Sequence, residues 1–246
     1  MYAIETKQLT KKYKTLTAVD ALDLSVQQGE LLALLGINGA GKSTTIKMLS
    51  CLSKPTAGDA FILGNSVTTD TQKVKEKINI SPQETAVAPN LTVRENLQLM
   101  SGVYGNPKHA AKAHADEIIQ RFGMEEIANS KAKTLSGGWQ RRLSIAMALI
   151  SQPEILFLDE PTLGLDVIAR RQLWRAIESL KGNITIILTT HYMEEAEALS
   201  DRIAIMAKGR LKAVGTAQEL IDRSGAKDFE SAFIAIAEDE GLEATK

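Results

Sequence analysis

Short apolar runs of strand length alternate with stretches of helical periodicity in the first and last thirds of the chain. Continuous apolar or β-branched runs occupy residues 30–35, 155–158 and 184–189, which is typical of strands buried on both faces. Helical patterns over residues 42–52 and 169–180 follow the first two of these runs. Strands that alternate with helices predict an α/β fold with a mainly parallel sheet covered on both faces.

Further strands are predicted outside this alternation. Residues 203–206 and 210–213 flank a Lys208-Gly209 turn, which predicts a hairpin. Short β-like runs also occur in the N-terminal part of the chain, at residues 2–6, 22–26 and 59–63.

The middle of the chain, residues 88–150, is predicted to be a helical lobe inserted between the strand-rich parts. Thr92 and Glu95 form a candidate capping box at the start of its first helix. A second helical pattern covers residues 108–122, and Ser136 is a candidate N-cap of a third helix.

Two helical segments are predicted near the C-terminus. Residues 193–199 form a short helix in which Glu194, Glu195 and Glu197 are expected to make a solvated acidic face. Apolar residues at helical spacing over residues 229–236 are expected to pack on the core.

A glycine-rich segment, the phosphate loop, occupies residues 36–43. It reads GINGAGKS and fits the pattern G-x-x-x-x-G-K-[ST], with a strand before it and a helix after it. Glycines let backbone N–H groups approach a phosphate, and the helix N-terminus adds a favourable dipole. We expect Lys42 to reach the β- and γ-phosphates of a nucleotide and the Ser43 hydroxyl to bind Mg²⁺. The alternative, a purely structural glycine-rich turn, is disfavoured by this context.

Two adjacent carboxylates, Asp159 and Glu160, stand at the carboxyl end of the predicted strand 155–158. Charges there are costly without a function, and ligands of open α/β sheets bind at this end. We expect Asp159 to support Mg²⁺ and Glu160 to polarise an attacking water. The alternative is an N-cap acid beside a solvated glutamate, and the neighbouring phosphate loop favours the catalytic interpretation.

A second candidate anion site, the signature segment Ser136, Gly137 and Gly138, opens the third helix of the lobe. Glycines at a helix N-terminus expose backbone N–H groups to an anion. Because the phosphate loop already supplies one complete cradle, the second site predicts contact with the nucleotide of another subunit.

With these motifs in this order, the chain resembles the nucleotide-binding subunits of ABC (ATP-binding cassette) transporters, from about residue 4 to about residue 220. Tyr13 matches the aromatic residue that stacks on adenine, Gln83 matches the Q-loop, Asp166 the D-loop and His191 the switch histidine. The resemblance extends ATP binding to the whole loop, namely Gly36, Asn38, Gly39, Ala40, Gly41, Lys42, Ser43 and Thr44.

The resemblance also implies an architecture. A single cassette over residues 1–246 would contain a P-loop NTPase core with an N-terminal antiparallel β subdomain, formed by residues 1–87 and 151–220. The helical subdomain would cover about residues 88–150, and residues 221–246 would form a C-terminal helical tail.

The resemblance further implies cofactors, roles and partners. ATP and Mg²⁺ would be the cofactors, and Ser43, Gln83 and Asp159 would surround the metal. The catalytic group would be Glu160, His191, Gln83 and Lys42. Two subunits would pair head to tail, so that the signature segment and Asp166 of one contact the ATP of the other. Separate transmembrane permease subunits would be the further partners, with the cassette peripheral at the cytoplasmic face of the membrane.

Composition and charge are compatible with these expectations. The chain has 29 Lys and Arg against 30 Asp and Glu, a net charge of −1, so no nucleic acid is expected as a partner. Its apolar runs are far shorter than the roughly 20 residues that span a membrane, and no signal-peptide pattern is seen. A single cysteine, Cys51, cannot form an internal disulfide, which fits a reducing compartment.

The direction of transport is indicated only by analogy. The segment at residues 90–97 and the short tail look most like bacterial exporter cassettes of the drug or sodium export type. An importer cassette is the first alternative. A soluble ABC-type ATPase that acts on nucleic acid or ribosomes is a weaker one, because a single compact set of motifs is present.

Overall fold

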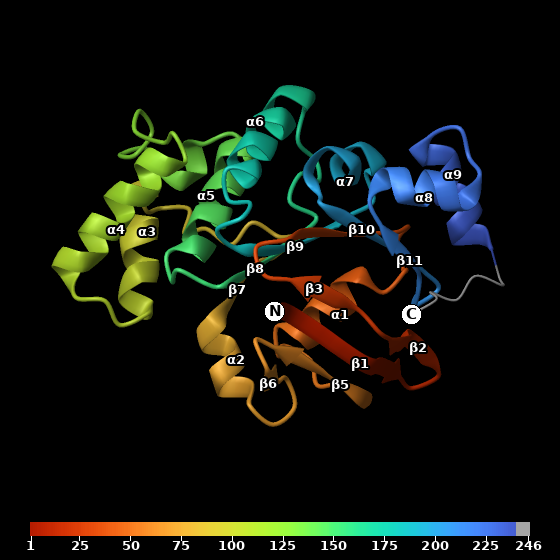
Figure 1. The fold of residues 1–246 in the computed structure, drawn as a ribbon. Coiled ribbons are helices and arrows are strands. Elements are labelled where there is room, and N and C mark those ends of the chain that lie inside the picture. Colours follow the sequence, from red (N-terminus) through yellow and green to blue (C-terminus); the bar gives the residue numbers. More distant parts are fainter. Residues whose placement is uncertain (240–246) are drawn as a thin grey trace.

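The computed structural model describes residues 1–239, which form a larger and a smaller β-sheet with helices between and beside them (Figure 1). The larger sheet contains β4 (Leu31–Leu35), β7 (Ile78–Ser81), β8 (Ile155–Asp159), β9 (Thr185–Thr190), β10 (Arg202–Ala207) and β11 (Arg210–Gly215). The smaller sheet contains β1 (Tyr2–Tyr13), β2 (Leu16–Leu22), β3 (Ser25–Gln27), β5 (Ala57–Ile62) and β6 (Asn65–Ser66). The helices are α1 (Lys42–Leu49), α2 (Thr71–Lys77), α3 (Val93–Val103), α4 (Lys108–Arg121), the 3-10 turn η1 (Ala132–Thr134), α5 (Gly137–Leu149), α6 (Val167–Glu178), α7 (Met193–Leu199), α8 (Ala217–Ser224) and α9 (Phe229–Glu238).

The larger sheet confirms the predicted mainly parallel arrangement. Its strand order is β11-β10-β4-β9-β8-β7, and all neighbours are parallel except the β10–β11 hairpin, which was also expected. Because parallel strands share one carboxyl edge, the segments that follow β4, β8 and β9 meet at that edge. The phosphate loop, Glu160 and His191 therefore come together although they are far apart in the sequence.

Both faces of the larger sheet are covered, as the continuous apolar strands predict. Leu32 and Leu34 of β4 lie in one core cluster with Ile46 of α1, which is sandwiched between the two sheets (Figure 1). Ala33 and Leu35 point to the other face and pack with residues of α7, α8 and α9. All five β4 side chains are fully buried, so this strand carries no polar face.

The smaller sheet is antiparallel, with β1 at its centre between β2 and β5. The predicted continuous run over residues 22–26 is wrong, because the chain breaks there between β2 and β3. The Thr6 hydroxyl explains the break: it donates to Leu22 O at 2.7 Å and accepts from Leu24 N at 2.8 Å. The Thr6 side chain thus replaces a backbone hydrogen bond between neighbouring strands, and β1 pairs with β2 and β3 instead of with one continuous strand.

Helices α3, α4 and α5 gather at one end of the molecule, within the expected range 88–150 (Figure 1). The capping box before α3 is confirmed: Glu95 N donates to Thr92 Oγ1, and Thr92 N donates to the Glu95 carboxylate. Ser136 is the residue before α5, as predicted, but its side chain makes no capping hydrogen bond.

Some elements of the fold were not predicted. Helix α2 escaped detection because Val74 is its only buried residue, so its sequence has no apolar periodicity. The next strand, β7, has only four residues and pairs along β8 at the edge of the larger sheet. Helix α1 ends at Leu49 rather than at residue 52, and Cys51 beyond it adopts a left-handed φ of 58°.

The C-terminal helices pack on the edge of the larger sheet. Phe229 and Ile236 of α9 are buried beside β10 and β11, which confirms the expected packing of residues 229–236. The rest of the expected tail, residues 240–246, lies outside the described residues. Within residues 1–239 no helix combines the length and the apolar character that crossing a bilayer needs.

One prediction about α7 is wrong. Glu194 and Glu197 are exposed, but Glu195 is fully buried and accepts hydrogen bonds from Thr162 Oγ1 at 2.8 Å and Trp174 Nε1 at 3.0 Å. Periodicity could not reveal this burial, because its partners come from other segments of the chain.

Candidate functional site

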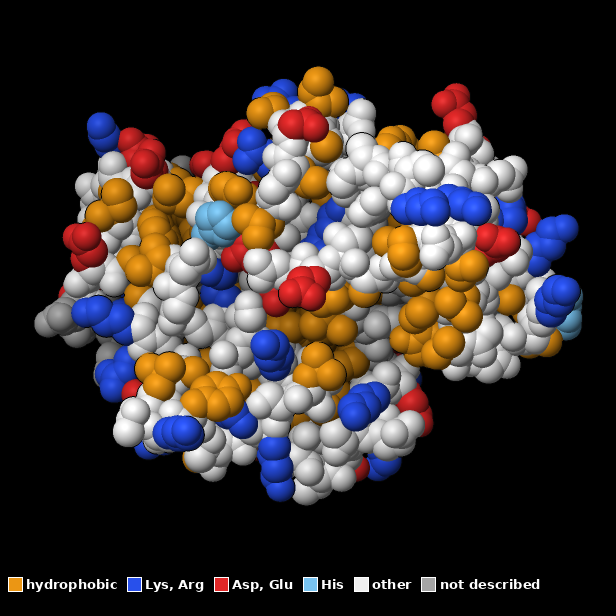
Figure 2. Space-filling view, turned by 180° about the vertical axis from the view of Figure 1, so that it is seen from behind, with side chains coloured by type: hydrophobic (Ala, Val, Ile, Leu, Met, Phe, Trp, Pro, Cys, Tyr) orange, Lys and Arg blue, Asp and Glu red, His pale blue; other side chains and the backbone are white. Residues whose placement is uncertain are grey.

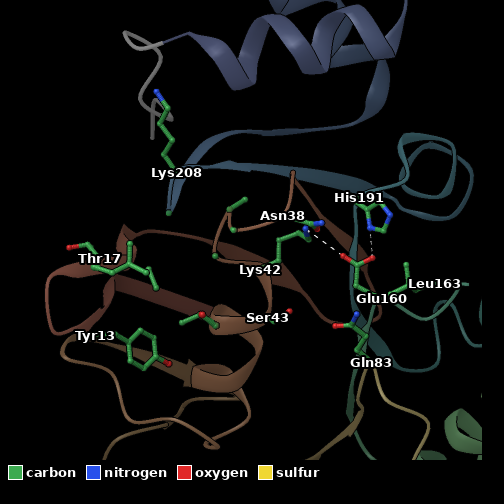
Figure 3. A pocket seen from close by; sticks show the side chains of 17 residues that line it. Tyr13, Thr17, Asn38, Lys42, Ser43, Gln83, Glu160, Leu163, His191 and Lys208 are labelled. Atoms are coloured by element: carbon green, nitrogen blue, oxygen red, sulfur yellow. Dashed lines mark hydrogen bonds and ion pairs between the residues drawn. The ribbon is translucent and has the colours of Figure 1, made fainter.

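A cavity of about 620 Å³ lies at the carboxyl edge of the larger sheet, next to the N-terminus of α1 (Figure 3). Most of the predicted site residues line it although they come from distant parts of the chain. They are Tyr13, Asn38, Gly39, Ala40, Gly41, Lys42, Ser43, Thr44, Gln83, Glu160 and His191.

The phosphate loop needs glycine for two reasons. Gly39 and Gly41 have φ values of 83° and 103°, which other residues rarely adopt. A Cβ atom at Gly41 would lie 2.5 Å from Ala18 O, and one at Gly36 would lie 2.4 Å from Met206 O. Gly36 therefore shapes the loop from behind rather than lining the cavity, and the loop can turn its backbone N–H groups toward a phosphate.

Glu160 lies between Lys42 and His191 (Figure 3). Its Oε1 is 3.5 Å from Lys42 Nζ, and its Oε2 is 2.6 Å from His191 Nδ1. Lys42 Nζ also donates to Gly36 O at 2.6 Å, which holds the ammonium group at the mouth of the loop. The Glu160 side chain is 8% exposed, so its attraction to the Lys42 ammonium group is weakly screened.

Asp159 faces Ser43 rather than Glu160. Its Oδ1 accepts hydrogen bonds from Ser43 Oγ at 3.0 Å and from Thr189 Oγ1 at 2.6 Å. The contact joins Ser43, the residue after the loop lysine, to Asp159, the last residue of β8. The sequence motifs predicted both residues for the same site but not the hydrogen bond between them.

The donor set around Ser43 fits a magnesium ion. A hydroxyl, the Asp159 carboxylate and the nearby Gln83 amide are all oxygen ligands, which Mg²⁺ prefers. Within residues 1–239 no three His, Cys, Asp or Glu side chains cluster as a metal site.

Several lining residues were missed by sequence reasoning. The start of β2 contributes Leu16, Thr17 and Ala18 beside Tyr13 at the end of β1, and the β10–β11 turn contributes Lys208 and Gly209. Tyr13 itself is 45% exposed, with Lys11 Nζ 5.1 Å from the centre of its ring. The hairpin pattern around Lys208 was a usable signal for a turn, but only the fold brings that turn to the phosphate loop.

The signature segment and Asp166 do not line this cavity. Asp166 is the N-cap of α6, where its Oδ1 accepts from Ile168 N and Ala169 N, both at 2.9 Å. Gly138 packs so closely on α6 that a Cβ atom there would lie 2.8 Å from Ala169 Cβ, whereas Gly137 has open space around it. Within one chain the two candidate anion sites are therefore separate.

Two buried ionisable groups stand behind the cavity. Arg141 of α5 is 4% exposed, and this burial lowers the pKa of its guanidinium to about 10 although Asp159 and Glu195 oppose the shift. Burial likewise raises the pKa of the Glu195 carboxyl, against the hydrogen bonds that it accepts. Arg141 is thus still cationic at neutral pH.

Comparison with known proteins relates the chain to the ABC transporter family. The family model described as "ABC transporter" matches residues 19–163. The daunorubicin/doxorubicin resistance ATP-binding protein DrrA of Streptomyces peucetius is 44% identical over 89% of this chain, and the linearmycin resistance ATP-binding protein LnrL of Bacillus subtilis is 41% identical over 90%. The match spans 66% of DrrA and 72% of LnrL, but only 42% of the probable multidrug ABC transporter ATP-binding protein YbhF of Escherichia coli, which is 40% identical.

Solved structures agree in fold. An ATP-binding subunit of an ABC transporter superposes with a TM-score of 0.82 at 28% identity, covering 95% of this chain and 99% of that one. The dimeric cassette MJ0796 in a post-hydrolysis state with ADP and Pi has a TM-score of 0.77 at 28% identity, covering 87% and 98%. With its phosphate loop, paired carboxylates and two-sheet fold, this chain belongs to the ABC transporter family as one of its ATP-binding proteins.

Proposed function

We propose that this chain binds and hydrolyses ATP to power a membrane exporter. The observation that carries the proposal is the Glu160 carboxylate, held between Lys42 and His191 beside a glycine loop shaped for phosphate. The names of DrrA and LnrL, which are resistance proteins, support export as the direction.

ATP binding would use the loop and its surroundings. Backbone N–H groups of residues 38–44 and the α1 N-terminus would hold the β- and γ-phosphates, with Lys42 beside them. Tyr13, across the cavity, would stack on the adenine (Figure 3). A bound Mg²⁺, held by Ser43, Asp159 and Gln83, would neutralise charge on the phosphates.

Hydrolysis would need a base for the attacking water. Glu160 has its carboxylate at the cavity wall and would accept the water proton, while Gln83 would orient that water. His191 holds Glu160 Oε2 at 2.6 Å and would donate to the γ-phosphate when nucleotide is bound. Positioning of the reacting groups and electrostatic stabilisation together supply most of the rate in phosphoryl transfer.

The complete site would need a second subunit. Ser136, Gly137 and Gly138 lie outside the cavity of their own chain, so we propose that they contact the ATP of a head-to-tail partner, together with Asp166. The dimeric state of MJ0796 supports this arrangement. We further propose one cassette over residues 1–246, with its helical subdomain at about 88–150 docking on separate permease subunits at the cytoplasmic face of the membrane.

Nucleic acid is a poorer candidate partner. Figure 2 shows Lys and Arg side chains scattered among acidic and uncharged ones on one face of the molecule, without a continuous basic stripe. The net charge of −1 agrees with this distribution.

The decisive experiment is the substitution Glu160→Gln. The amide keeps the size of the side chain but cannot take the water proton, so kcat should fall by about 100-fold or more while ATP still binds. In the presence of ATP the variant should accumulate as a dimer in size-exclusion chromatography. Hydrolysis by this variant at the wild-type rate would show that Glu160 is not the base.

A matched control exists on the neighbouring segment. Glu154 lies just before β8, and Glu160 lies just after it. The half-exposed side chain of Glu154 pairs with Lys77 away from the cavity. Glu154→Gln should leave ATP turnover unchanged. Partner identity is tested by co-purification: a hydrophobic membrane chain supports the transport proposal, and bound nucleic acid contradicts it.

A further inference from the structure

The backbone of Glu160 is strained. Its φ is 49°, in the left-handed region that favours glycine, although the residue carries a full side chain. Such a conformation persists only where the surroundings enforce it, and it is commonly found where a side chain must be aimed. Glu160 N is anchored to Thr189 O at 3.2 Å and Thr189 Oγ1 at 3.0 Å, which holds one side of the turn.

Arg141 of α5 holds the same turn from the side of the helical lobe. Its Nη2 donates to Asp159 O and its Nε donates to Pro161 O, both at 2.8 Å, so it grips the carbonyls on either side of Glu160. Its Nη1 donates to Pro82 O and to Gln83 O, the latter at 3.2 Å. One guanidinium thus ties together the segments that carry the proposed base and the proposed water-orienting amide.

Glu195 holds the turn from α7. Its Oε1 accepts from Thr162 Oγ1, two residues after Glu160, and from Trp174 Nε1 of α6. Neither Arg141 nor Glu195 lines the cavity. Arg141 Nε and Nη2 and Glu195 Oε1 therefore bond to residues 159–162, whereas the buried Glu195 Oε2 has no hydrogen-bond partner among residues 1–239.

We propose that Arg141 and Glu195 are positioning residues that clamp residues 159–162 from two sides and so hold Glu160 between Lys42 and His191. The inference deepens the proposed function, since it concerns the geometry of the proposed base. Arginine suits this task because its rigid fork of N–H donors reaches several carbonyls at once and keeps its charge. Lysine, with a single ammonium group, cannot bridge both segments.

The test compares Arg141→Lys and Arg141→Met with the control Arg142→Met. Arg142 is the next residue of α5, donates to Phe122 O and stacks on Trp139, and does not touch residues 159–162. Loosening the turn displaces Glu160 without removing any phosphate contact. We expect kcat for ATP to fall about 10- to 100-fold in both Arg141 variants, with the Kd for ATP within about threefold of wild type.

Two variants test the role of Glu195. Glu195→Gln keeps an oxygen for Thr162 and Trp174 and should retain kcat within about twofold, whereas Glu195→Met should lower it about tenfold. A Glu195→Met variant with wild-type kcat overturns this half of the clamp. For Arg141, a rise in Kd with unchanged kcat, or wild-type kcat in Arg141→Lys, overturns the other half.

Hydrogen exchange supplies a readout that does not depend on turnover. The amides of Leu163 and Leu165 donate to Glu160 O and Thr162 O, and the amide of Glu160 donates to Thr189 of β9. These three amides should exchange faster in the Arg141 variants than in Arg142→Met, while those of β4 stay unchanged. Equal exchange in all variants contradicts the clamp. If wild-type protein fails to hydrolyse ATP, the proposed function fails, and the exchange data still decide whether the clamp exists.

Discussion

Gly138 offers a test of whether the signature glycines serve packing or anion binding. The substitution Gly138→Ala would place a Cβ atom 2.8 Å from Ala169 Cβ of α6. Carbon atoms pack at about 3.5–4.0 Å, so α5 and α6 would have to separate by roughly 0.7 Å or more. Gly137→Ala is the matched control, because nothing lies within 4 Å of its added Cβ.

The expected magnitude follows from two opposing effects. Overpacking costs about 1–3 kcal/mol, and replacing glycine by alanine in a helix returns up to about 1 kcal/mol. Gly138→Ala should therefore lower the free energy of unfolding by about 1–2 kcal/mol, which lowers Tm by about 2–8 °C for a chain of this size. Gly137→Ala should leave it unchanged or raise it slightly.

The assay is a double-mutant cycle in which the stability of each variant is measured by urea unfolding. Ala169→Gly removes the methyl group that Gly138→Ala meets, so the double variant should recover about 1–2 kcal/mol relative to the sum of the single changes. Measuring ATP turnover tests the anion-binding role separately from the packing role. If backbone N–H groups of the signature segment contact the partner's ATP, Gly137→Ala should lose turnover while keeping its stability.

The reasoning would be refuted by additive single changes, since the close approach of α5 and α6 would then carry no energy. Wild-type turnover in Gly137→Ala would refute the anion-binding role instead. The two outcomes are independent, because the first concerns contacts within one chain and the second concerns contacts across a dimer.

Two further predictions concern buried polar groups. The Asn96 side-chain amide accepts a hydrogen bond from Ala88 N at 2.8 Å and donates to three carbonyls of the segment before α3. Asn96→Ala should therefore lower the free energy of unfolding, measured in urea, by about 2–4 kcal/mol. A smaller loss of stability than in Thr92→Ala would contradict this. Burial raises the pKa of Glu195, so its contribution to stability is full below the ordinary pKa of about 4.3 and is lost as pH rises through the folded value. Glu195→Gln should therefore gain stability relative to wild type as pH rises above the ordinary glutamate pKa, and a pH-independent difference would disprove the shift.

Much of the site was predictable because its chemistry is written in local motifs. The loop GINGAGKS needs its glycines, lysine and serine in consecutive positions, so spacing alone identified Lys42 and Ser43. Asp159 and Glu160 were identifiable because an apolar strand that ends in two charges is rare without a function. The capping box at Thr92 is local in the same way.

The misses have a common cause in contacts between distant segments. Glu195 has the periodicity of a solvated helix face, and only Thr162 and Trp174, from other elements, make its burial possible. Lys208 reaches the cavity only because β10 lies beside β4 in the sheet order. The break at residues 22–26 results from a hydroxyl that lies some 16 residues earlier in the chain.

The sequence by itself determined the fold class, the phosphate loop and the two carboxylates, because each depends on the order and spacing of neighbouring residues. Only the tertiary structure decided that Glu160 has a left-handed backbone, that Arg141 grips the carbonyls on either side of it, and that Gly138 touches Ala169. The physical reason is that backbone strain and buried hydrogen bonds are settled by the mutual placement of packed elements, which no local pattern records.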